Sequence, residues 1–299
     1  MRVSFLPTGL TEWSGLPTAF ARLFPGHRFD VFPTAAEMAS HGGNYPFVGL
    51  TSCRLTAADE TSPPDAATLL VRRAAKVLMD RDPPDLLVIL DDLELANRDQ
   101  PERVVRVFRA AIEKHLSSLD RLQQRTGQRL AERASFHLVA PMIEAWFFGD
   151  PAALVNAGVV EKPFLKPDCS IEEFTTTDLG YLAATESDCP GWQRKPQKSR
   201  RPKWFGVDRV FHPKGYLQWL TGDPADRNCT RYRETEHGAA ALRSIDWDAL
   251  RGQAGMNFLN ALCEDIAYAL DAPYKSPVDV VPVATSLARR PAQNLLRNL

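Results

Sequence analysis

One short apolar segment constrains the fold of this chain more than any other. Residues 86–90 are Leu-Leu-Val-Ile-Leu, a run without a polar residue that follows two prolines. A run of this length suits a strand that is buried on both faces, as in a parallel sheet. The acidic sequence Asp91-Asp92-Leu93-Glu94 follows at once. The pattern therefore predicts a central parallel strand with carboxylates at its end.

Strands and helices are predicted to alternate on both sides of this segment. Hydrophobic patterns and breakers indicate strands at 2–6, 28–32, 85–90 and 135–140, and helices at 12–24, 66–81, 101–127 and 141–149. Thr11 is the expected cap of the first helix, and residues 33–65 are an expected long loop. Alternation of this kind is typical of an α/β fold with a mainly parallel sheet flanked by helices.

The second half of the chain is predicted to be mostly helical. Helical patterns return at 213–220, 236–244 and 256–270, an edge strand is expected at 278–283, and the basic tail after Ala288 is expected to be poorly ordered. We therefore expect an α/β core at 1–155, an insertion with a basic loop at 156–210, and a helical part at 211–299 that completes the same domain.

Composition excludes some classes of function. The 299 residues carry a formal net charge of -1, so no overall field draws the chain to nucleic acid or membranes. The sequence contains no run of about 18 apolar residues, so no membrane span is predicted. The N-terminus does not resemble a signal peptide. The five cysteines are dispersed, without a CxxC pair, which fits reduced thiols. These features favour a cytoplasmic protein.

The acidic cluster is the first candidate site. Asp91, Asp92 and Glu94 are expected beyond the carboxyl end of a parallel strand, where such sheets place their sites. Three carboxylates this close repel one another, and a bound divalent cation removes that cost. Oxygen ligands suit Mg²⁺ or Mn²⁺. The alternative is a solvated acidic turn that caps the next helix.

Two further glutamates are expected near the same edge of the sheet. Glu144 follows the strand at 135–140, and Glu12 follows the first strand and a glycine-containing loop. Each is a candidate to complete a metal shell or to take part in catalysis. Each is alternatively a residue that compensates a helix dipole or caps a helix. The neighbouring Trp146, Phe147 and Phe148 are expected in the core.

A basic stretch is the candidate surface for nucleic acid. Basic side chains interleaved with aromatic ones can bind phosphates and stack on bases, although a solvated loop is the alternative. The stretch lies between Trp192 and Trp204 and contains Arg194, Lys195, Lys198, Arg200, Arg201 and Lys203. Lys214, between Pro213 and Gly215, either contacts a phosphate or belongs to a structural turn.

Four parts of the chain resemble a known family. They are residues 6–12 (Leu-Pro-Thr-Gly-Leu-Thr-Glu), 90–94 (Leu-Asp-Asp-Leu-Glu), 143–151 (Ile-Glu-Ala-Trp-Phe-Phe-Gly-Asp-Pro), and 212–216 (His-Pro-Lys-Gly-Tyr) with 232–235 (Tyr-Arg-Glu-Thr). The first two resemble the Toprim domain of topoisomerases, primases and overcoming-lysogenization-defect nucleases. Together the four resemble a bacterial Toprim-like family with a Glu-Ala-Trp motif, often encoded beside ABC-type or SMC-type ATPases in defence islands.

The resemblance implies Mg²⁺-dependent phosphodiester chemistry. By position, Asp92 and Glu94 match the spaced acidic pair of Toprim nucleases, with Asp91 as an alternative first member, and Glu12 matches the second glutamate of the first motif. The chain departs from the pattern in two places. Pro7-Thr8 stands where a glutamate ends the first strand, and the second acid of the pair is Glu rather than Asp. Glu144 is the candidate for the missing carboxylate.

The lead hypothesis is a metal-dependent nuclease that acts on DNA or RNA as an effector of antiphage defence, together with an ATPase partner. A homo-oligomer is left open. The second hypothesis is a catalytically degenerate regulatory or scaffold subunit of the same system, which the replaced glutamate favours. A metal-dependent nucleotide-sugar transferase is the third, because an acidic pair after a buried strand also fits such enzymes, although the Glu-Ala-Trp segment argues against it.

Overall fold

A four-stranded, all-parallel sheet forms the centre of the molecule, in the order β2-β1-β3-β4. The computed structural model describes residues 1–43, 45–120, 122–164, 170–184, 207–222, 232–274, 276–289 and 294–299. The strands are β1 (Arg2–Pro7), β2 (Arg28–Val31), β3 (Leu86–Asp92) and β4 (Ala134–Val139). The predicted α/β fold with a parallel sheet is confirmed.

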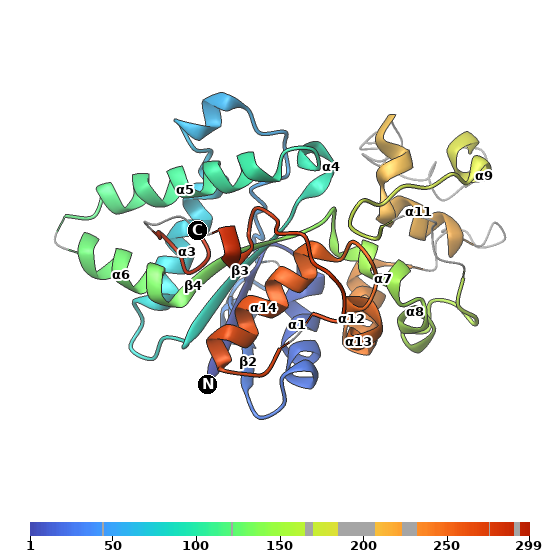
Figure 1. Cartoon of the computed structure of the whole chain (residues 1–299), viewed down its shortest axis with the longest axis horizontal. Helices are drawn as coiled ribbons and strands as arrows, with labels where there is room; N and C mark the ends of the chain where they lie inside the picture. Colours follow the sequence, from blue (N-terminus) through green and yellow to red (C-terminus); the bar gives the residue numbers. More distant parts are fainter. Residues whose placement is uncertain are drawn as a thin grey trace.

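Helices cover both faces of the sheet and make up most of the C-terminal region (Figure 1). In the first half they are α1 (Leu10–Leu23), α2 (Ala35–Ser40), η1 (Ala57–Glu60), α3 (Asp65–Leu78), α4 (Glu94–Asn97), α5 (Pro101–Ser117) and α6 (Gln123–Arg133). After β4 they are η2 (Ile143–Ala145), α7 (Trp146–Gly149), α8 (Ala152–Asn156), α9 (Leu179–Ala183), η3 (Val207–Phe211), α11 (Pro213–Leu220), η4 (Glu234–Gly238), α12 (Ala239–Ser244), α13 (Trp247–Arg251), α14 (Asn257–Leu270) and η5 (Leu287–Arg289).

Residues 86–90 of strand β3 are all apolar, and they are buried on both faces of the sheet. Successive side chains of a strand point to opposite faces of the sheet. Leu87 and Ile89 therefore join the core under α3 and α5, whereas Leu86, Val88 and Leu90 join the core under α1, α12 and α14 (Figure 1). The same alternation sends Asp91 and Asp92 to opposite sides at the end of the strand.

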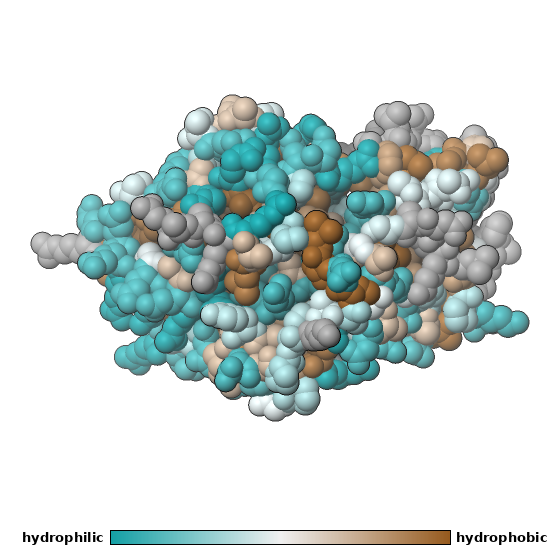
Figure 2. Space-filling model, in the orientation of Figure 1, coloured by the Kyte–Doolittle hydropathy of each residue, from teal (hydrophilic) through white to brown (hydrophobic). Residues whose placement is uncertain are grey.

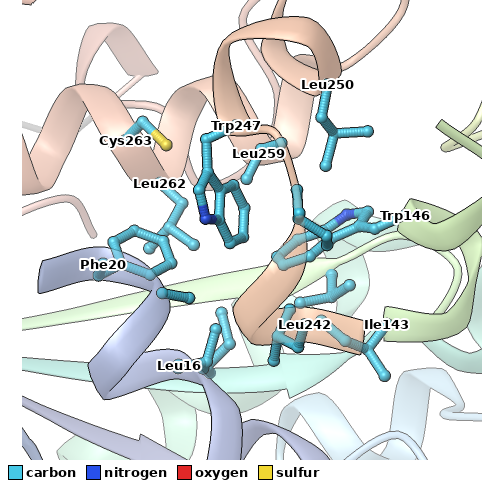
Figure 3. Packing of buried hydrophobic residues seen from close by; sticks show 14 of the residues in the cluster. Leu16, Phe20, Ile143, Trp146, Leu242, Trp247, Leu250, Leu259, Leu262 and Cys263 are labelled. Atoms are coloured by element: carbon cyan, nitrogen blue, oxygen red, sulfur yellow. The ribbon is translucent and has the colours of Figure 1, made fainter. Parts of the chain in front are cut away.

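The C-terminal helices share a hydrophobic core with the first helix. Trp247 of α13 packs between Phe20 of α1 and Trp146 of α7, with ring centroids 5.3 Å and 5.7 Å away (Figure 3). Leu242 of α12 lies in the same cluster. Trp146, Phe147 and Phe148 are all buried there, which confirms their expected place in the core. The predicted domain boundaries themselves stay a prediction.

Three local predictions in the first half were wrong. The expected helix at 101–127 is two helices, because the hydroxyls of Ser117 and Ser118 bond back to backbone oxygens and end α5. Gly127 lies inside α6, where it faces Leu116 of α5 and does not end a helix. The expected loop at 33–65 contains α2 and η1. Helix α1 begins after Gly9, so Thr11 is a buried residue of its first turn and not its cap.

Two predictions near the C-terminus were also wrong. Residues 278–283 form no strand, and they include Pro282, which has no backbone N–H, and the exposed Val281. In the tail after Ala288, residues 290–293 lie outside the described residues, whereas residues 294–299 are packed and not loose. Leu296 and Leu299 are buried, and the backbone N–H of Arg297 donates to the backbone oxygen of Ala134 at the start of β4.

The described helices also bear on membrane association. Within the ranges that the structure describes, no helix is long and apolar enough to cross a membrane.

The face shown in Figure 2 is mainly hydrophilic over α5 and α6, with apolar side chains exposed in small patches nearer its centre.

Candidate functional site

A pocket of about 500 Å³ lies where β1, β3 and β4 end. The parallel register pairs Pro7 with Leu90 and Asp92 with Val139, so these three strands end at one edge of the sheet. Carboxyl ends of parallel strands are where such sheets bind ligands. Six acids line the pocket, namely Glu12, Asp91, Asp92, Glu94, Glu144 and Glu234. The structure thus brings together every acid that the sequence singled out.

Asp92 lies at the centre of this group. It is half-buried at the end of β3, and its Oδ1 accepts a hydrogen bond from the backbone N–H of Ile143, at 3.1 Å. Burial, and then the charges of Glu12, Glu94, Glu144 and Asp91, raise the pKa of Asp92 well above its ordinary value. A carboxylate surrounded by other carboxylates in this way favours a bound cation.

Glu12 approaches Asp92 from the first turn of α1. The helix begins directly after Gly9, and any side chain at Gly9 would collide with the Glu12 carboxylate. Glu12 is 5% exposed, and its Oε2 has no hydrogen-bond partner among the described residues. Burial, together with the charges of Glu144 and Glu234, raises its pKa to about 8. An unsatisfied buried carboxylate oxygen is costly unless a ligand completes it.

Asp91 lies on the opposite side of β3 from Asp92. Its Oδ1 accepts a hydrogen bond from the Thr8 hydroxyl (2.5 Å), and its Oδ2 accepts from the backbone N–H of Leu50 (2.9 Å) and the Thr51 hydroxyl (3.3 Å). Burial raises its pKa to about 6, against these hydrogen bonds, which lower it. Because both oxygens are engaged, Asp91 holds the loop at 49–51 against the sheet and is less suited to ligate a metal.

Asn97 of α4 binds the continuation of this loop, residues 51–55. Its side-chain amide donates to the backbone oxygens of Thr51 and Cys53, both at 2.9 Å, and its oxygen accepts from the backbone N–H of Leu55, also at 2.9 Å. Asn97 is fully buried. This wall of the pocket is therefore fixed by two side chains, Asp91 near the end of β3 and Asn97 at the end of α4.

Glu94 adopts a strained backbone conformation at the rim. Its φ is 56°, in the left-handed region that non-glycine residues seldom occupy. The backbone N–H groups of Leu93 and Glu94 donate to the oxygens of Val139 and Pro141, at 2.7 Å and 2.8 Å. The chain after β3 is thus bound to the chain after β4, and this holds Glu94 at the pocket. Strain of this kind is concentrated at functional sites.

Glu144 is paired with a lysine from the C-terminal region. It is 2% exposed on η2, and its Oε1 lies 3.2 Å from Lys214 Nζ and 3.4 Å from the hydroxyl of Tyr232, which donates to it. Lys214 also forms an ion pair with Glu234. Burial raises the pKa of Glu144 even though Lys214 lowers it. Burial acts to lower the pKa of Lys214, but Glu144 and Glu234 together raise it above its ordinary value.

His212 is placed beside Lys214 as a helix cap. Its Nδ1 accepts a hydrogen bond from the backbone N–H of Gly215 at the start of α11, at 3.1 Å. Burial, and then the charge of Lys214, lower its pKa to about 4, so the ring is neutral at physiological pH. Lys214 is therefore the only cationic side chain among the described residues that line this pocket.

The remaining predicted site residues cannot be located in the same way. Arg194, Lys195, Lys198, Arg200, Arg201 and Lys203 lie outside the described residues. The interpretation of that stretch as a nucleic-acid surface stays a prediction.

In the described parts of the chain, no group of three His, Cys, Asp or Glu side chains is arranged to hold a metal ion by itself. An ion at this edge would need water or substrate oxygens in its shell, as is usual for Mg²⁺.

Sequence reasoning missed three residues that shape the pocket and left the role of a fourth, Glu234, open between a polar rim and a buried ion pair. Thr8, Thr51 and Asn97 build its wall, and Glu234 completes the Lys214 pair. The first three follow no periodic pattern, since their role lies in hydrogen bonds across 40 residues or more. Glu234 lies in one of the segments of the family resemblance, and that was the one signal that pointed to it.

The comparisons with known proteins add no relative. No family model, no curated protein and no solved structure matches this chain. The function of this chain is therefore inferred from its fold and from the geometry of the pocket.

Proposed function

We propose that this pocket binds Mg²⁺ or Mn²⁺ and serves phosphodiester hydrolysis in DNA or RNA, as in Toprim-like nucleases. One observation carries the proposal. β1, β3 and β4 are adjacent parallel strands; Glu12 follows β1, Asp92 ends β3 and Glu144 follows β4, and these acids meet in a single pocket. Nucleases of this class need carboxylates at such an edge to position a cation against a phosphate.

The chemistry of the pocket fits a hard divalent cation. Glu12 carries a buried oxygen that finds no hydrogen-bond partner within the described ranges, and Asp92 lies among acids that raise its pKa. These two residues would hold the ion, with Glu94 at the rim beside them. Mg²⁺ is often bound through one or two carboxylates, with waters and substrate phosphates in the other positions. When bound, such an ion lowers the pKa of water and offsets the charge that develops on a phosphate.

The family resemblance supports the same reading and supplies the biological setting. All four of its sequence segments contribute residues to this pocket: Glu12, Asp92, Glu144, and Lys214 with Glu234. On that resemblance we extend the proposal to an effector of antiphage defence that acts with an ABC-type or SMC-type ATPase. This extension rests on the resemblance alone.

A specific observation favours a second candidate, a catalytically degenerate regulatory or scaffold subunit. Thr8 stands where the resemblance implies a glutamate, and its hydroxyl is bonded to Asp91. The glutamate that the resemblance implies at the end of β1 is thus replaced by Thr8. The carboxylate of Asp91 is held by hydrogen bonds within the protein. This candidate predicts cation binding without turnover.

The two candidates are separated by a cleavage assay. The purified protein is incubated with plasmid DNA and with total RNA in Mg²⁺ or Mn²⁺, alone and with an ATPase encoded next to its gene. Nuclease function predicts cleavage that Asp92→Asn abolishes and that the exposed control Asp279→Asn retains. Binding of Mn²⁺ without cleavage under any of these conditions supports the degenerate subunit.

A further inference from the structure

We propose that Lys214 is a built-in cation that limits this pocket to a single divalent ion. The inference rests on the proposed metal site and concerns how the site is divided. Lys214 extends from the first turn of α11, and its ammonium contacts Glu144 of η2 and Glu234 of η4. Two of the six pocket acids therefore already share a cation supplied by the protein.

The contacts of Lys214 hold it firmly in this position. Its side chain is 29% exposed, so most of its surface is removed from water. The hydroxyl of Tyr232, which is fully buried, donates to the same Glu144 oxygen that Lys214 contacts. Breaking this pair would leave a buried carboxylate uncompensated, which is far costlier than breaking a surface ion pair. A metal ion is thus not expected to displace the lysine.

The other half of the pocket has no such cation among the residues that the structure describes. Glu12 and Asp92 form no ion pair with any Lys, Arg or His among these residues. Glu12 Oε2 is buried and finds no hydrogen-bond partner in the described parts of the chain, so it marks the side on which a ligand would bind. The pocket is therefore divided into a lysine-compensated half, with Glu144 and Glu234, and a half open to a metal ion, with Glu12 and Asp92.

A local feature of the backbone, a π-helical turn, positions Glu234 beside Lys214. Glu234 opens this turn, η4, which leads into α12. Such turns are rare and frequently occur at functional sites. Gly238 in this turn lies against Thr11 of α1 and the Tyr232 hydroxyl, where a larger residue would collide with the Thr11 side chain. The lysine-compensated half is thus built by the C-terminal region against the start of α1.

Binding stoichiometry tests the inference. The full chain is freed of metal with EDTA and titrated with Mn²⁺ at pH 8 by calorimetry, with electron paramagnetic resonance to detect magnetic coupling between bound ions. We expect one ion per chain for the wild type and for Lys214→Arg, which keeps the charge. Lys214→Met is expected to bind two ions, with a coupled spectrum, because Glu144 and Glu234 become free to bind the second.

The outcomes separate this inference from the proposed function. A wild-type chain that binds no Mn²⁺ removes the metal site itself and both proposals. Two ions in the wild type, or one ion in a folded Lys214→Met variant, overturns the division of the pocket and leaves the metal site in place. Glu144→Gln gives an independent check if Lys214→Met does not fold. It should still bind one ion, and loss of that ion would make Glu144 a ligand and contradict the inference.

Discussion

The Thr8 hydroxyl donates a hydrogen bond to Asp91 Oδ1 across two neighbouring strand ends, at 2.5 Å. Thr8 follows β1 directly, and Asp91 is the penultimate residue of β3. With Leu50 and Thr51 bonded to its other oxygen, Asp91 joins the edge of the sheet to the loop at 49–51. Its neighbour Asp92 faces the carboxylates of Glu12 and Glu144 instead. Of the two adjacent aspartates, Asp91 is thus surrounded by hydrogen-bond donors and Asp92 by other carboxylates.

This hydrogen bond should be measurable in the stability of the protein. Replacement of Thr8 by Val keeps the shape of the side chain but removes the donor to a buried carboxylate. We expect Thr8→Val to lower the free energy of unfolding by about 1–3 kcal/mol. Urea unfolding at pH 8, where Asp91 is ionised because its pKa is about 6, gives the comparison. Thr8→Ser retains the hydroxyl and should lose clearly less stability, and equal losses for the two variants would contradict this role of the hydroxyl.

The two aspartates should respond in opposite ways to the same substitution. Asp91→Asn places an amide where three hydrogen-bond donors converge, so the metal-free protein should lose stability. Asp92→Asn removes a charge that Glu12, Glu94 and Glu144 repel, so the metal-free protein should gain stability, by about 1 kcal/mol or more. Thermal unfolding in EDTA measures both. A loss of stability in Asp92→Asn would mean that its environment is not dominated by repulsion.

Glu12 should make the metal-free protein less stable as the pH rises. Its pKa is about 8 in the folded chain against an ordinary value of 4.5, so between these values the folded state binds the extra proton. Stability therefore falls with increasing pH across this window. Glu12→Gln should flatten the decline in Tm between pH 5 and 8, although not fully, because Asp91 and Asp92 shift in the same direction.

The control for this pH dependence is an exposed glutamate on α5, Glu113, replaced by Gln. This variant should follow the wild-type profile. Saturating Mn²⁺ should raise the Tm of the wild type most at high pH, since binding requires the ionised carboxylates. A Glu12→Gln profile that runs parallel to the wild type would show that Glu12 does not hold a proton in the folded state.

The strained backbone at Glu94 predicts a conflict between stability and binding. At a φ of 56° a residue with a side chain costs roughly 1–2 kcal/mol, which glycine does not incur. Glu94→Gly and Glu94→Ala both remove the carboxylate, but only glycine relieves the strain. We expect Glu94→Gly to be more stable than Glu94→Ala by about 1 kcal/mol in urea unfolding, and both to bind Mn²⁺ more weakly than the wild type. Equal stabilities would exclude the strain.

The sequence by itself determined the sheet and the identity of its acidic edge. The apolar run at 86–90 indicates a strand that is buried on both faces, because one-sided packing would show alternating polar residues and the run between Pro84 and the acids is too short for a typical helix. The residues after this strand are then expected at the carboxyl edge, together with those after the neighbouring parallel strands. On this reasoning Asp92 is expected at that edge, and Glu12 and Glu144 are candidates for it, with capping or helix-dipole roles as their alternatives.

Element ends were less well determined, because they depend on side chains that compete locally. Serine hydroxyls ended α5 ten residues before Gly127, where the hydrophobic pattern predicted the end of one long helix. The last six residues looked like a loose basic tail, yet Leu296 and Leu299 are buried and Arg297 is bonded to Ala134. Neither outcome follows from periodicity, which reports only which face of an element is apolar.

Only the tertiary structure decided how the acids at this edge divide their roles. The alternation of side chains along β3 sends Asp91 to the hydroxyls of Thr8 and Thr51 and Asp92 to the pocket, but the partners come from distant segments. Lys214 meets Glu144 from 70 residues away in the chain. Ion pairs and hydrogen bonds of this kind leave no periodic trace in a sequence, because their energy depends on the distance and burial that folding creates.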